Sequence, residues 1–122
     1  MKKLLGILAA VTQSLGMAPA QAEDHAKNVV LINTFTVPVE AIDEAITMWE
    51  TARDFLKAQP GYISTKLHRS LSPDAKYQLI NVAEWESPEA FKAATGLMQK
   101  KAILQRIEGV VPGPGLYKVI RE

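Results

Sequence analysis

Apolar positions recur along the chain with two different periods, and these periods predict its first elements. The run VVLINTFTV over residues 29–37 is β-branched and aromatic and stops at Pro38, so it predicts a strand. Apolar residues in steps of three and four then form one helix face: Ile42, Ala45, Ile46, Trp49, Ala52, Phe55 and Leu56. The pair Pro60-Gly61 is expected to end that helix.

Two further strands are predicted in the middle of the chain. Residues 62–70 and 77–85 contain aromatic and β-branched types and are predicted as strands; alternation along the first would place Tyr62, Ser64, Lys66 and His68 in one series. Ser72-Pro73-Asp74 between them has the chemistry of a turn. The pattern therefore predicts a pair of antiparallel strands.

A second helix and a closing strand follow. Ser87-Pro88 supplies an N-cap and a proline at the first helical position. We expect this helix to break at Gly96 and a second helical piece to form over residues 101–108. A loop over residues 109–114 and a strand over residues 115–120 are predicted after it.

This order of elements is β-α-β-β-α-β, which predicts an α+β, ferredoxin-like fold with a four-stranded antiparallel sheet. Two helices can cover only one face of such a sheet. The first strand is nevertheless apolar on both faces, because Val30 and Ile32 alternate with Leu31. A sheet that is apolar on both faces needs a second cover. We therefore expect a homodimer packed sheet to sheet.

The first 22 residues have the layout of a secretory signal peptide. Lys2-Lys3 gives a positive start, residues 4–11 an apolar core, and Ala20-Gln21-Ala22 a small-x-small cleavage site. A membrane anchor is the alternative, but a spanning helix needs about 20 apolar residues. The sequence predicts an exported protein, periplasmic or secreted, without stable membrane insertion after cleavage.

Removal of that leader changes the charge of the chain. Of 14 basic residues, Lys2 and Lys3 would be lost, which leaves 12 against 13 acidic residues and a net charge of −1. No basic cluster remains, so nucleic acid is not an expected partner. We expect a flexible lead-in over residues 23–28 and one domain over residues 29–122. A domain of this size without cysteine has a small core and no disulfides, which again favours a dimer.

The amino-acid sequence of residues 59–91 resembles the antibiotic biosynthesis monooxygenase (ABM) family: QPGYISTKLHRSLSPDAKYQLINVAEWESPEAF. The Gln-Pro-Gly turn, the His68-Arg69-Ser70 strand end and the Trp-Glu-Ser-Pro-Glu-Ala-Phe junction carry the resemblance. It implies a dimeric α+β barrel and a cofactor-independent monooxygenase acting on a small aromatic or quinol-like substrate. Members of such a family share a scaffold more than a reaction.

Two residues are candidates for catalysis. Asn33 interrupts the apolar series of the first strand, and a buried amide without partners costs about 1–3 kcal/mol. It either lines an active cavity, as the resemblance implies, or ties two strands together. His68 is suited to proton transfer near neutral pH, or it is a strand-end histidine bonded to neighbouring backbone.

Two more residues are candidates for binding the substrate. Asn81 and Trp85 share a face of the strand over residues 77–85. Antiparallel pairing would place this strand beside the first, so that Asn81 and Asn33 share one polar pocket. The alternative for Trp85 is a packing residue of the core.

Other kinds of site are poorly supported by the sequence. The only histidines are His25 and His68 and there is no cysteine, so no metal-ligand set is present. The resemblance implies that haem-degrading relatives carry a Trp and a His on the helices after the third strand. Ala94 and Leu104 fall at those places here, so haem is disfavoured and no cofactor is expected. A non-catalytic dimer that binds a small ligand remains an alternative, and the presence of a ligand-sized cavity would separate the two.

Overall fold

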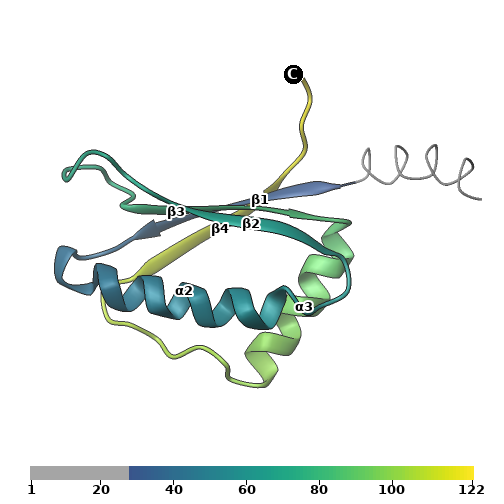
Figure 1. The fold of residues 1–122 in the computed structure, drawn as a ribbon, viewed down its shortest axis with the longest axis horizontal. Helices are drawn as coiled ribbons and strands as arrows, with labels where there is room; N and C mark the ends of the chain where they lie inside the picture. The colour runs from purple at the N-terminus through teal and green to yellow at the C-terminus, as the bar shows by residue number, and fades with distance from the viewer. Residues whose placement is uncertain (1–27) are drawn as a thin grey trace, which may run out of the picture.

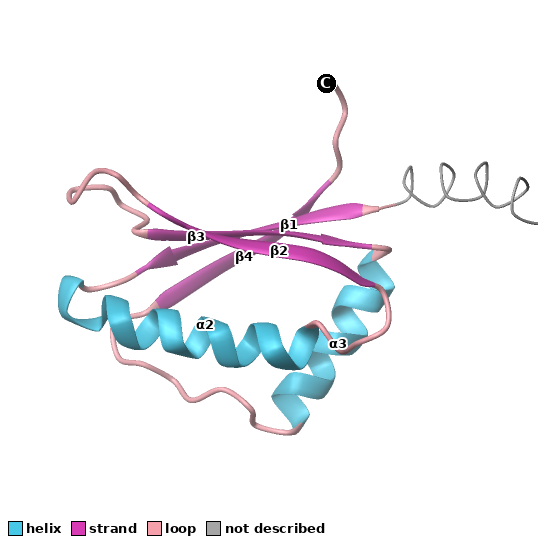
Figure 2. Cartoon of the chain, viewed as in Figure 1, coloured by secondary structure: helices cyan, strands magenta, loops and turns pink. Residues whose placement is uncertain are grey.

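A computed structural model describes residues 28–122, so the predicted leader over residues 1–22 and most of the lead-in, residues 23–27, lie outside the described residues. The elements in chain order are β1 (Val29–Thr36), the 3-10 helix η1 (Val39–Ala41), α2 (Ile42–Leu56), β2 (Tyr62–Arg69), β3 (Leu79–Trp85), α3 (Pro88–Lys100) and β4 (Val111–Tyr117). They confirm the predicted β-α-β-β-α-β order (Figures 1 and 2). Within the described range, no helix is long and apolar enough to cross a membrane.

The four strands form one antiparallel sheet in the order β2-β3-β1-β4. Both α2 and α3 lie on the same side of it, and no helix of residues 28–122 covers the opposite side (Figures 1 and 2). The sheet therefore has a helix-covered face and an open face. We use these two names below.

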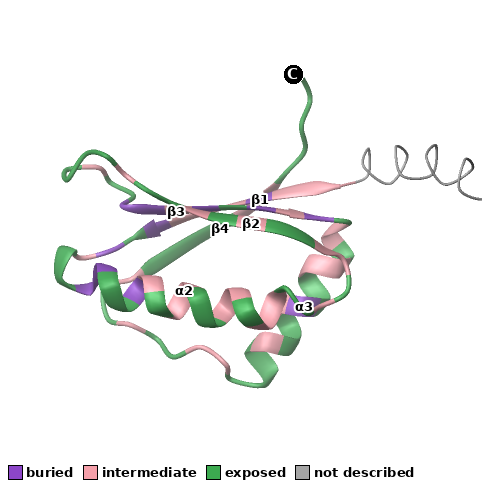
Figure 3. Cartoon of the chain, in the orientation of Figure 1, coloured by how far each residue is buried: buried purple, intermediate pink, exposed green. Residues whose placement is uncertain are grey.

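The core lies between the helix-covered face and the helices, where most buried residues are found (Figure 3). Alternate residues of β3 are buried, as expected for a strand that faces a core on one side. Trp85 at its end is only 1% exposed and meets Tyr62 and Phe91 edge to face, with ring centroids 5.6 and 5.7 Å away. These aromatic pairs fix β2 and α3 against β3.

Two predicted local signals are confirmed at the ends of the helices. Ser87 Oγ accepts a hydrogen bond from the backbone N–H of Ala90 at 3.0 Å, which caps α3 as predicted. The turn after α2 contains Gly61 at φ 87°, a left-handed conformation that favours glycine. A Cβ at Gly61 would also collide with Cβ of Ala90, so the turn packs directly on α3.

Three predictions in the last third of the chain are wrong. Helix α3 runs through Gly96 without a break, and no atom outside the helix lies within 4 Å of the position that a Cβ would take there. No helix forms over residues 101–108, because Ala102 adopts φ 52° and turns the chain out of α3. The closing strand begins at Val111 instead of residue 115. Its prolines are tolerated because β4 pairs only with β1 and is an edge strand.

Candidate active-site cavity

A cavity of about 590 Å³ lies between the helix-covered face of the sheet and the two helices. All four strands contribute to one side of it, and α2, α3 and the loop between α3 and β4 line the rest. Most of the wall is apolar. The polar lining residues are Asn33, Arg53, Tyr62, Thr65, Asn81, Thr95, Gln99 and Arg106. A mostly apolar cavity with a few polar groups is the usual form of a small-molecule site.

Asn33 and Asn81 are directly opposite each other in the register of β1 and β3, and both line the cavity. Each amide oxygen is held by the protein. The backbone N–H of Gly113 donates to Asn33 Oδ1 at 3.1 Å, and Thr65 Oγ1 donates to Asn81 Oδ1 at 2.6 Å. Because the oxygens are engaged, the two Nδ2 groups are the amide ends available to a ligand.

Neither of these Nδ2 groups has a hydrogen-bond acceptor among residues 28–122. In the same part of the chain, no fully buried side-chain nitrogen or oxygen lacks a partner. The amide nitrogens are therefore accessible from the cavity. Two N–H₂ donors from neighbouring strands, with Cβ atoms about 5 Å apart, form a donor pair on the floor of the cavity.

Asn33 satisfies both interpretations drawn from the sequence. Its oxygen ties β1 to β4 through Gly113, and its side chain also lines the cavity. Trp85 was predicted either to bind the substrate or to pack in the core; it is buried in the core and also contributes to the cavity wall. The structure thus brings Asn33, Asn81 and Trp85 together at one site.

His68 is not part of that site. It pairs with Ile80 across β2 and β3, and its exposed ring places Nδ1 3.3 Å from the carbonyl oxygen of Ile80. Thr65 lines the cavity, so His68, three positions along the same strand, lies on the open face. The contact to neighbouring backbone is the alternative predicted for His68 from the sequence.

A register shift in β2 explains why the sequence placed His68 with Tyr62. The strict alternation Tyr62, Ser64, Lys66, His68 would put all four on one face. A β-bulge between Tyr62 and Ser64 reverses this order, so Tyr62 reaches the cavity while the other three do not. The predicted alternation is wrong at this point, and Tyr62 and Thr65 were missed for that reason.

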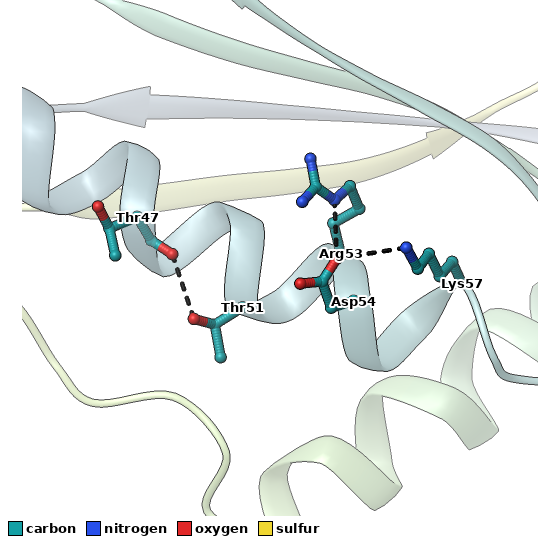
Figure 4. A network of polar contacts seen from close by, with 5 residues as sticks. All are labelled: Thr47, Thr51, Arg53, Asp54 and Lys57. Carbon is teal, nitrogen blue, oxygen red and sulfur yellow. Dashed lines mark hydrogen bonds and ion pairs between the residues drawn. The ribbon is translucent and has the colours of Figure 1, made fainter.

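Two arginines line the cavity and were also missed. Arg106 lies in the loop that was predicted as a helix and is exposed. Arg53 comes from α2, where its guanidinium carbon lies 5.2 Å from the ring centre of Trp49, one helical turn earlier. Trp49 and Arg53 are four residues apart, and this spacing could have predicted that the two side chains lie together on one face of α2. In Figure 4, Arg53 extends from α2 toward the strands of the sheet.

Arg53 takes part in a small charge cluster on α2. Its Nε lies 3.0 Å from Oδ1 of Asp54, and Lys57 Nζ lies 3.5 Å from the same oxygen (Figure 4). The hydrogen bond from Arg53 is the main reason that the pKa of Asp54 is lowered. Nearer the start of α2, Thr51 Oγ1 donates to the carbonyl oxygen of Thr47 at 3.2 Å (Figure 4). Asp54 itself does not line the cavity, and among the described residues no Asp, Glu or His does.

A metal or haem site finds little support in these residues. Across residues 28–122, no group of three or more His, Cys, Asp or Glu could hold a metal ion. Among these described residues, neither His nor Cys lines the cavity as a strong haem ligand. Ala94 is buried in the core, and Leu104 contributes an apolar side chain to the wall.

Comparisons with known proteins give a consistent result. The family model described as antibiotic biosynthesis monooxygenase matches residues 28–106. A proposed monooxygenase from Shewanella loihica PV-4 is 46% identical with a TM-score of 0.72, and the match covers 78% of this chain and 96% of that one. No curated protein matches the chain.

More distant solved structures differ in their activities. SnoaB, a cofactor-independent oxygenase from Streptomyces nogalater, is 25% identical with a TM-score of 0.63 over 80% of this chain and 97% of that one. MhuD, a haem degrader from Mycobacterium tuberculosis, is 23% identical with a TM-score of 0.60 over 77% and 97%. The similarity to MhuD shows only the fold.

Proposed function

The chain belongs to the antibiotic biosynthesis monooxygenase family, and from that premise we propose a cofactor-independent monooxygenase that acts on a small aromatic or quinol-like substrate. The family match and the relative from Shewanella loihica support a monooxygenase-type reaction. The observation that carries the finer proposal is the donor pair of Asn33 and Asn81 in an apolar cavity.

The reaction we propose needs no external reductant. A hydroxylated aromatic substrate loses its hydroxyl proton, and the resulting anion passes an electron to O₂. The two radicals combine to form a carbon–oxygen bond, and the hydroperoxide loses water to leave a carbonyl group. One oxygen atom stays on the ring, the other leaves as water with the hydroxyl and ring protons, and the substrate supplies all four electrons.

The amide pair would serve the first step of this reaction. Two N–H₂ donors aimed at the substrate oxygen stabilise its anion in a mostly apolar cavity. Since no Asp, Glu or His of residues 28–122 lines the cavity, ionisation depends on the lowered pKa of the substrate, and the proton passes to water. The catalytic role predicted for His68 gains no support from its position on the open face.

The aromatic wall would orient the ring that reacts. Trp85 lines the cavity together with Tyr62 and Phe91, and the contacts among the three hold each ring at a steep angle to the next. A flat substrate can stack on such a wall without a conformational change. We therefore propose that Asn81 and Trp85 bind the substrate, with Asn33 as the second anion donor.

Haem is the less favoured alternative. The similarity to SnoaB supports a reaction without a cofactor, and no His or Cys within residues 28–122 lines the cavity. A titration of the protein with haem tests this directly. A shifted Soret band that saturates at one equivalent would contradict the proposal, whereas we expect no saturable shift.

We also propose that the protein is an exported homodimer. Residues 1–22 support export by their signal-peptide layout. The open face supports a second copy, because apolar side chains stand on it in the absence of any covering helix. These residues are Val30, Ile32, Ile80, Val82 and Tyr117. Native mass spectrometry should find a chain that starts at Glu23 and a dimer mass.

The proposed activity is tested by oxygen uptake with a panel of hydroquinones and anthrones. We expect uptake coupled to one carbonyl product per O₂ consumed, and we expect catalase and metal chelators to leave the rate unchanged. Saturable binding of the panel without any uptake would instead establish the ligand-binding alternative.

A further inference from the structure

The charged groups of the cavity are all positive. Arg53 and Arg106 line it, and no carboxylate from the part of the chain that the structure describes does. The two sit on the α2 side and in the loop after α3, whereas the amide pair sits on the sheet. A ligand that spans the cavity from sheet to helix therefore meets neutral donors at one end and a guanidinium at the other.

Arg53 is held in a way that leaves most of its donors free. A guanidinium has five N–H donors in a planar fork. The Nε donor binds Asp54, and the guanidinium carbon lies over the ring of Trp49, 5.2 Å from its centre. The four N–H groups on the two terminal nitrogens have no acceptor among the described residues. The contacts with Asp54 and Trp49 hold the guanidinium at the cavity wall, with these donors unused.

Asp54 does not cancel the charge at this position. It is the counter-ion of both Arg53 and Lys57, so the three side chains together carry one excess positive charge. Asp54 is exposed, where solvent weakens an ion pair. The side chain of Arg53 is 35% exposed and borders the apolar wall, where an arriving anion is better shielded from water.

We propose that Arg53 binds an acidic group of the substrate, so that the preferred substrates are hydroxylated aromatic acids instead of neutral quinols. The carboxylate would pair with the terminal nitrogens of Arg53, and the reacting hydroxyl would lie at the amide pair of Asn33 and Asn81. A planar guanidinium fork suits a carboxylate in two parallel hydrogen bonds. This inference rests on the function proposed above and adds the substrate class.

Equilibrium dialysis with a matched pair of probes tests it. The acid 6-hydroxy-2-naphthoate and its neutral amide differ only in the group meant for Arg53, and their two substituents lie at opposite ends of the ring system. We expect the acid to bind at least tenfold tighter. In Arg53→Gln, binding of the acid should weaken at least tenfold while the Kd of the amide changes less than twofold.

Three further variants make the result specific. Lys57→Gln removes the other cation that pairs with Asp54 but does not touch the cavity, so both Kd values should stay within twofold. Arg53→Lys keeps the charge and loses the fork, so it should retain only part of the preference for the acid. Arg106→Gln should affect both probes by less than Arg53→Gln affects the acid, because Arg106 is exposed.

Several results would overturn the inference. Equal Kd values for acid and amide in the unmodified protein would do so. An Arg53→Gln variant that weakens both probes equally, or a loss of acid preference in Arg106→Gln alone, would do so as well. Oxygen uptake is measured separately. Preferential binding of the acid without oxygen uptake would contradict only the proposed reaction. Oxygen uptake without preferential binding of the acid would contradict only the role of Arg53.

Discussion

Asn33 and Asn81 face each other across β1 and β3, and the protein binds the oxygen of each amide while leaving the nitrogen toward the cavity. The donor to Asn33 is the backbone N–H of Gly113 and cannot act as an acceptor, so it fixes the orientation of that amide. The donor to Asn81 is the hydroxyl of Thr65. The backbone donor thus fixes the amide of Asn33, whereas the hydroxyl of Thr65 holds the oxygen of Asn81 in the arrangement that leaves its nitrogen as a donor.

The first prediction separates catalysis from folding in this pair. Asn81→Ala removes one donor from the anion site and should lower kcat by about 100-fold, within the range known for loss of a single fixed donor to a developing anion. Asn33→Ala should lower kcat similarly and also cost about 1 kcal/mol of stability, because it leaves the N–H of Gly113 without its acceptor. Oxygen uptake and urea unfolding measure the two effects. Loss of stability without loss of turnover in Asn33→Ala would leave only its strand-tying role.

The second prediction concerns Thr65, which positions Asn81 without contacting the substrate anion itself. Thr65→Val keeps the shape of the side chain and removes the hydroxyl donor, so the amide of Asn81 can turn its oxygen toward the cavity. We expect kcat to fall about tenfold with little change in KM, since one fixed donor is lost in part of the molecules. Thr65→Ser restores the hydroxyl and should restore most of kcat. Equal kcat in Thr65→Val and Thr65→Ser would contradict this role.

The third prediction is that His68 is dispensable for turnover. Its ring lies on the open face and its Nδ1 contacts backbone, so His68→Gln should leave kcat and its pH profile within about twofold of the unmodified protein. The rate is measured from pH 5 to 9 with one quinol substrate. A tenfold loss of kcat, or a changed pH profile, would show that His68 takes part in the reaction.

The position of His68 also shows how far the sequence could predict this site. Period and turn chemistry were sufficient for the order of elements and for the pairing of Asn33 with Asn81. They failed at β2, because a bulge between Tyr62 and Ser64 inserts one residue and reverses the alternation, and single-sequence periodicity contains no signal for it. They failed again after α3, where the apolar residues Ile103, Leu104 and Ile107 keep helical spacing but form a loop. Arg106 was missed with that loop.

The fourth prediction tests the turn that joins α2 to the sheet. Gly61→Ala introduces a Cβ at φ 87° and in collision with Ala90, so we expect a loss of about 2–4 kcal/mol in the free energy of unfolding. Gly96→Ala is the matched control: its site is open and helical, so stability should rise by about 0.5–1 kcal/mol. Urea denaturation followed by Trp fluorescence reports both. A Gly61→Ala variant as stable as the unmodified protein would contradict the described turn.

The last prediction tests the proposed dimer through the open face. Val82 stands on that face with 37% of its surface exposed, opposite Ile32 on one side and Lys66 on the other. Val82→Asp should disrupt sheet-to-sheet packing, because the interface would bury a carboxylate. Within one subunit the new Asp can pair with Lys66, so the fold should be retained. Light scattering coupled to gel filtration should show a dimer for the unmodified protein and a monomer for Val82→Asp.

Leu71→Asp is the control for this comparison, since Leu71 is fully exposed in the connection between β2 and β3, outside the four strands. It makes the same kind of change in charge and hydrophobicity without placing a carboxylate on a strand of the sheet. We expect Leu71→Asp to remain dimeric, and circular dichroism to show the same secondary structure in both variants. A Val82→Asp protein that stays dimeric would place the interface elsewhere. Dissociation of both variants would indicate a general effect of charge, because only Val82 lies on a strand.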